Sequence, residues 1–149
     1  MRDIKFRGLN TKGQWVYGSL VVTTVGLNTS RGQHTKTWII ESAFGNGGWF
    51  NIMKRQYVYP KTVGQYIGKN DKNDAKIFDG DILAFNHKTD PHGIQKLLAY
   101  VCYEAVGFTL KHITDSFLDG LIDLSSSVEF EVVGSIHKNH ELLLLKDVA

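Results

Sequence analysis

Apolar and polar side chains alternate along much of this chain with the period of two that is typical of β-strands. The alternation begins at Ile4 and Phe6, which are separated by a lysine, and it returns over residues 15–22. Between these runs lie Asn10 and Gly13, residue types that favour turns. We therefore predict that the chain begins with a β-hairpin.

Further runs of β-branched, aromatic and aliphatic residues recur along the chain, bounded by glycine, proline and polar clusters. A tight turn at Asp79–Asp81 leads into one of them, because the central glycine tolerates backbone angles that other residues avoid. Apolar residues at 116–124 recur at helical spacing, which predicts one or two helical turns, and His140–Lys146 fits either a short helix or a last strand. We predict strands at 37–40, 56–59, 62–67, 82–85, 97–103, 108–112 and 128–135.

Strands separated by turns rather than by long helices predict antiparallel sheets. We expect a mainly β fold with little helix and with a small SH3-like barrel in the C-terminal half. The composition changes near Pro60, from a part rich in glycine and tryptophan to a part with regular alternation. We expect a single domain over 1–149, with two sub-domains: a hairpin region at 1–60 and a β-barrel region at 61–149.

The composition bears on the cellular compartment and on nucleic-acid binding. The 149 residues include 17 Lys and Arg and 15 Asp and Glu, and this small excess of bases does not by itself indicate nucleic acid. A single cysteine, Cys102, cannot form an internal disulfide and fits a reducing cytoplasm. No apolar run resembles a signal peptide, and the longest apolar stretch, Leu142–Leu145, is far below the ~20 residues of a membrane span. We expect a cytoplasmic protein that does not enter the membrane.

Three stretches of the sequence keep the order and spacing of a known family. They are 4–18, with Ile-Lys-Phe-Arg-Gly and Gly-Gln-Trp-Val-Tyr-Gly; 62–83, from Thr-Val-Gly-Gln-Tyr-Ile-Gly to Ile-Phe-Asp-Gly-Asp-Ile-Leu; and 131–143, with Glu-Val-Val-Gly-Ser-Ile and Asn-His-Glu-Leu-Leu. Together they resemble the YopX-like family of phage and prophage proteins. The resemblance implies a largely β protein of a phage or prophage, working in a bacterial host cell, with no assigned activity and no catalytic residues.

The chain departs from the family pattern at several places. Where the family usually has Asn-Gly, this chain has Asn73 and Asp74, and aspartate tolerates a positive φ less readily than glycine. Near the end, His137 and His140 replace an aromatic residue and a proline that are frequent in the family. The region 87–123 matches least, and the resemblance implies nothing about it.

Acidic residues gather between Asp71 and Asp81, which raises the question of a metal site. An EF-hand loop needs glycine at its sixth position and glutamate at its twelfth. Counted from Asp71, these positions hold Lys76 and Ile82. We therefore interpret the segment as structural turns. A metal-dependent hydrolase built around Asp79 and Asp81 is an alternative that no cleft-forming pattern supports.

Other chemistry-bearing residues do not form a recognisable site. His137 and His140 have a spacing that zinc ligands use, but zinc needs three or four ligands and Cys102 is distant in sequence. Cys102 lies in an apolar run, where we expect a buried small side chain rather than a nucleophile. Neither a serine-hydrolase elbow, a phosphate-binding loop nor a dinucleotide fingerprint is present in the sequence. We predict no catalytic residue, no cofactor, no metal and no enzyme activity.

The leading hypothesis is a non-enzymatic accessory protein that binds an unknown macromolecule. The alternative is a nucleic-acid-binding β-barrel, because such barrels place aromatic rings beside a basic groove. Its candidate contacts are Lys54, Arg55, Tyr57 and Tyr59, although aromatic residues on strands more often belong to the core. Edge strands, or the glycine-flanked Trp49–Phe50 pair, are candidates for joining copies into a homo-oligomer.

Overall fold

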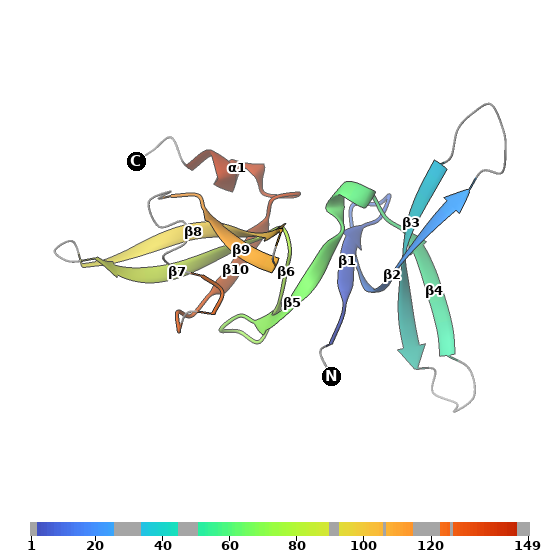
Figure 1. Ribbon diagram of the computed structural model, residues 1–149, viewed down its shortest axis with the longest axis horizontal. Coiled ribbons are helices and arrows are strands. Elements are labelled where there is room, and N and C mark those ends of the chain that lie inside the picture. Colours follow the sequence, from blue (N-terminus) through green and yellow to red (C-terminus); the bar gives the residue numbers. More distant parts are fainter. Residues whose placement is uncertain are drawn as a thin grey trace. The chain divides into compact units, whose positions relative to one another are not determined.

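The computed structural model describes residues 3–25, 34–44, 51–89, 93–105, 107–114, 123–125 and 127–145. These residues form ten β-strands, one 3₁₀ turn and one short α-helix (Figure 1), so the prediction of a mainly β fold with little helix is confirmed. The Trp49–Phe50 pair and most of the helical turns expected at 116–124 lie outside them. The chain divides into two compact units, Met1–Tyr66 and Ile67–Ala149, and the composition change at Pro60 falls within the first.

The first unit is built from four antiparallel strands in sequence order. They are β1 (Phe6–Leu9), β2 (Trp15–Val25), β3 (His34–Phe44) and β4 (Asn51–Tyr57), which appear in blue to teal in Figure 1. The predicted hairpin is confirmed by the pairing of β1 with β2. The start of β5 (Gly64–Asn70) pairs with the other side of β1.

The segment after β4 returns to the end of β1. An isolated bridge joins Asn10 to Val58, and the Tyr59 N–H donates to the Leu9 carbonyl at 2.9 Å. Val58 is completely buried and forms the core of this unit with Val16 and Ile39. The chain can approach so closely because residue 8 is a glycine, and a Cβ there would lie 2.9 Å from the Val58 Cβ. The 3₁₀ turn at Pro60–Thr62 then leads into β5.

The second unit contains an open antiparallel sheet. Its strands β7 (Asp81–Thr89), β8 (Gly93–Glu104), β9 (Gly107–His112) and β10 (Glu131–Ser135) are ordered β10-β7-β8-β9. The short β6 (Lys76–Phe78) pairs with β5. In the described part of the chain no ladder joins β9 to β10, so the expected SH3-like barrel is not confirmed. The C-terminal run contains a helix, α1 (His140–Leu143), rather than a strand.

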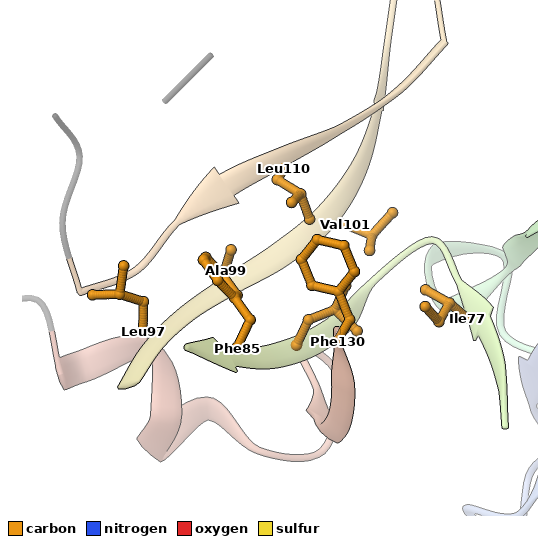
Figure 2. Packing of buried hydrophobic residues seen from close by; sticks show 8 residues of the cluster. Ile77, Phe85, Leu97, Ala99, Val101, Leu110 and Phe130 are labelled. Carbon is orange, nitrogen blue, oxygen red and sulfur yellow. The ribbon is translucent and has the colours of Figure 1, made fainter. Parts of the chain in front are cut away.

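The core of the second unit lies on one face of this sheet. Alternate residues in the middle of β8, Leu97, Ala99 and Val101, point into it, and β6, β7, β9 and the residue before β10 supply the remaining side chains. Figure 2 shows Phe85 and Phe130 among the aliphatic side chains of the cluster. The centroids of their two rings lie 5.4 Å apart. The buried cluster consists of Ile77, Leu83, Phe85, Leu97, Ala99, Val101, Leu110 and Phe130.

Candidate functional site

A hollow of about 510 Å³ opens in the first unit between the β1–β2 turn and the end of β4. From the turn and the start of β2, its lining includes Asn10, Lys12, Gln14 and Trp15. The turn is held by Asn10, whose Oδ1 accepts from the backbone N–H groups of Lys12 and Gln14, both at 3.0 Å. The loop tip at Lys12 is therefore presented by an ordered turn.

Strand β4 contributes Lys54, Gln56 and Tyr57 to the same hollow. Two of the four nucleic-acid contacts expected from the sequence, Lys54 and Tyr57, therefore line one site. Arg55 does not line it, because its guanidinium lies over the Trp38 ring, 4.5 Å from the centroid. Tyr59 lies outside the lining as well, but its exposed ring meets the Tyr57 ring edge to face with 6.2 Å between centroids.

A chain of carboxamides forms the floor of the hollow. Asn10 Nδ2 donates to Gln14 Oε1 and to Gln56 Oε1, each at 3.3 Å. Gln56 Nε2 in turn donates to Glu41 Oε1 at 3.2 Å. Asn10 is 8% exposed, so this network keeps a buried polar side chain hydrogen-bonded.

The aromatic walls of the hollow are held by neighbouring side chains. The Arg7 guanidinium lies 4.2 Å from the centroid of the Trp15 ring, a cation–π contact made by a side chain that is only 5% exposed. Tyr57 meets Trp38 edge to face, with 5.8 Å between the ring centroids. These contacts fix the planes of Trp15 and Tyr57 before a ligand arrives.

The hollow carries positive charge. Lys12 and Lys54 are both exposed, and neither forms an ion pair within the described ranges. The nearby carboxylate of Glu41 accepts from Gln56 and does not belong to the lining. The arrangement offers two ammonium groups and two aromatic rings to a ligand that is anionic or rich in hydrogen-bond acceptors.

The sequence alone did not point to Lys12, Gln14 or the amide floor. The link from Asn10 to Gln56 joins residues 46 positions apart and depends on the return of the chain at Val58. The one local signal was Asn10 itself, because an asparagine followed by a glycine-containing loop commonly bonds its own turn. That signal predicts the turn but not what the turn faces.

Comparison with known proteins identifies the family. The sequence model described as YopX protein matches residues 5–144, which is nearly the whole chain. The chain belongs to the YopX family. A crystal structure of protein EF1440 from Enterococcus faecalis is similar, with 21% sequence identity, a TM-score of 0.49 and an alignment that covers 96% of this chain and 99% of that one. A comparison with curated proteins gave no match.

The acidic turn of this YopX-family chain is structural. Asp71 Oδ1 accepts from the N–H groups of Asn73 and Ala75 at 2.8 and 2.9 Å, and Oδ2 accepts from Val132 N–H at 3.0 Å. Burial alone would raise the pKa of Asp71, but the hydrogen bonds from Val132, Ala75 and Asn73 outweigh it and the pKa is lowered. The carboxylate thus joins the β5–β6 turn to β10.

Asp81, one of the two residues of the hydrolase alternative, also has a structural role. It is 1% exposed, and its Oδ2 accepts from the Phe78 N–H at 2.8 Å across the turn between β6 and β7. Gly80 between the two aspartates has a φ of 83°, which explains the glycine at this bend. Asp79 is half-buried in the same turn.

The histidines and the cysteine are placed as follows. His137 is half-buried and His140 is exposed at the start of α1. Within the residues that the structure describes, no three His, Cys, Asp or Glu side chains gather as metal ligands would. Cys102 is half-buried rather than fully buried, because even-numbered residues of β8 face away from the core. No described helix has the length and apolar character needed to traverse a lipid bilayer.

Proposed function

We propose that this YopX-family protein acts by binding a macromolecule rather than by catalysis, and that the hollow of the first unit receives single-stranded nucleic acid. The observation that supports this most is the gathering of Lys12 and Lys54 beside the rings of Trp15 and Tyr57. Lysines attract the phosphate backbone, and aromatic rings stack on bases, which is how proteins hold single strands without a duplex. The same proposal places the protein in a bacterial host cell, as the product of a phage or prophage.

The size and walls of the hollow favour a single strand over a duplex. A space of about 510 Å³ is of the size that receives small molecules and unstacked bases. The base edges of a single strand can turn into such a space, whereas the bases of a duplex stay stacked within it. The two ammonium groups then meet the phosphates that flank an inserted base.

A titration of labelled oligonucleotides tests the proposal. We expect oligothymidylate of about 15 nucleotides to bind more tightly than a duplex of the same length. The affinity should fall with salt, and the slope of log K against log salt should be about −0.7 for each phosphate contact, hence about −1.4 if both lysines contact phosphates. Fluorescence anisotropy at several salt concentrations measures both quantities.

Matched variants locate the binding site. Lys12→Ala and Lys54→Ala should each weaken binding and reduce the size of the salt slope by about 0.7. Lys61→Ala is the control, because Lys61 is an exposed lysine of the same unit that lies in the 3₁₀ turn and not in the hollow. The proposal is wrong if no oligonucleotide binds at low salt, or if Lys61→Ala weakens binding as much as the two hollow variants.

A further inference from the structure

The carboxamide groups at the floor of the hollow cannot turn independently. Asn10 Oδ1 accepts from two backbone N–H groups, so its oxygen must face the turn. Its nitrogen then faces Gln14 and Gln56 and can only donate to their oxygens. A carboxylate supplies an independent restraint, because Glu41 accepts from Gln56 Nε2 and so requires the same orientation of Gln56.

This orientation leaves Gln14 with its nitrogen directed away from Asn10. Gln14 Oε1 is engaged by Asn10, and Gln14 Nε2 donates to no other residue among those described. The side chain is exposed and lines the hollow. The amide and ammonium groups left for a ligand are therefore Gln14 Nε2 and the ammonium groups of Lys12 and Lys54, and all three are donors. The hydroxyls of Thr11 and Tyr57 also line the hollow and can either donate or accept.

A donor that is fixed at Gln14 Nε2 distinguishes the nucleobases. Guanine, thymine and uracil carry keto oxygens, which accept hydrogen bonds, at the position where adenine and cytosine carry an amino group, which donates. When the amino group of a base faces Gln14 Nε2, both groups are donors, so no hydrogen bond forms between them and the two repel each other. Resting on the proposed function, we propose that the hollow prefers keto bases to amino bases and that Gln14 reads the difference.

Oligothymidylate and oligodeoxycytidylate of equal length are the probes that test this preference. Both are pyrimidine strands with the same phosphates, so the ratio of their affinities isolates the difference at the base edge. We expect the intact protein to bind oligothymidylate about five- to tenfold more tightly, the effect of one hydrogen bond made rather than opposed. Anisotropy titrations at one salt concentration give the ratio.

Gln14→Glu is the decisive variant. One carboxylate oxygen can still accept from Asn10 Nδ2, while the other presents an acceptor where the amide presented a donor. The thymidylate-to-cytidylate ratio should fall to about one or below. Thr35→Glu is the control, because it adds the same charge at an exposed position of β3 outside the hollow and should leave the ratio unchanged.

The possible outcomes distinguish a failure of the keto preference from a failure of the proposed nucleic-acid binding. If neither strand binds, the proposed function fails. If both bind with equal affinity, or cytidylate binds more tightly, binding stands and the keto preference is wrong. If thymidylate is preferred but Gln14→Glu leaves the ratio unchanged while circular dichroism shows an intact fold, Gln14 does not read the base.

Discussion

Replacing Asp71 with alanine removes the carboxylate that joins the β5–β6 turn to the Val132 N–H of β10. Three backbone N–H groups lose their acceptor, those of Asn73, Ala75 and Val132. Asn73 and Ala75 are exposed and can bond to water, so each should cost about 0.5–1 kcal/mol. The Val132 N–H lies in the sheet, and leaving it without an acceptor should cost about 1–3 kcal/mol. We expect the free energy of unfolding of the second unit to fall by about 2–5 kcal/mol.

The assay must report on the second unit. All three tryptophans of the chain lie in Met1–Tyr66, so tryptophan emission does not follow this change directly. Urea denaturation measured by far-UV circular dichroism gives the free energy, and amide hydrogen exchange at Val132 and Ala75 gives the local opening. Each 1.4 kcal/mol lost should speed exchange at Val132 about tenfold, where exchange occurs through unfolding of the unit.

The dependence on pH supplies a second, independent check. The folded pKa of Asp71 is lowered relative to the unfolded chain, where it is about 4. The charged carboxylate therefore stabilises the fold fully at pH values above the unfolded pKa, and this stabilisation is lost as the pH falls through the lower, folded pKa. The difference between the intact protein and Asp71→Asn should be constant near neutrality and shrink below about pH 4.

Glu129→Ala is the control for both measurements, since it removes an exposed carboxylate from the same unit. Its free energy of unfolding should stay within about 0.5 kcal/mol of the intact protein. The reasoning is refuted if Asp71→Ala behaves like this control, or if protection of the Val132 amide does not change.

Two further substitutions test local features of the backbone. Asp74 has a φ of 64°, a backbone angle that glycine adopts at less cost than aspartate. Asp74→Gly should therefore stabilise the second unit by about 0.5–1 kcal/mol, although it removes the hydrogen bond that Asn70 donates to Asp74. Asp74→Ala should destabilise the unit, and urea denaturation of both variants measures the two effects. Gly8→Ala should destabilise the first unit by about 1–3 kcal/mol, because the new Cβ would lie 2.9 Å from the Val58 Cβ, and tryptophan emission during denaturation follows the change.

Local patterns predicted the strands because each strand depends on residues that are adjacent in sequence. The alternation at Ile4 and Phe6 and the turn residues at Asn10 and Gly13 were sufficient for the first hairpin. Barrel closure could not be predicted in the same way. An open sheet and a small barrel share the same alternation and the same turns, and they differ only in whether the first and last strands pair across the fold.

The sequence predicted only those residues of the candidate site that lie close together along one strand. Lys54 and Tyr57 are close in sequence and both line the hollow, but alternation along β4 separates Lys54 from Arg55, which pairs with Ile40 and lies over the Trp38 ring. Lys12 enters the site only because Asn10 meets Val58. Such a contact depends on the path of the whole first unit, and no local pattern contains it.

The two units use similar polar side chains for different ends. In the second unit, the carboxylates of Asp71 and Asp81 accept hydrogen bonds from backbone N–H groups within the fold. These carboxylates therefore stabilise turns. In the first unit, Asn10 satisfies the oxygens of Gln14 and Gln56 and leaves donors directed outward. The amide oxygens are thus hydrogen-bonded within the fold, while Gln14 Nε2 and the ammonium groups of Lys12 and Lys54 face the hollow. That asymmetry is the physical reason to seek an acceptor-rich ligand there and not at the acidic turn, where a metal ion would have to compete with three backbone donors for Asp71.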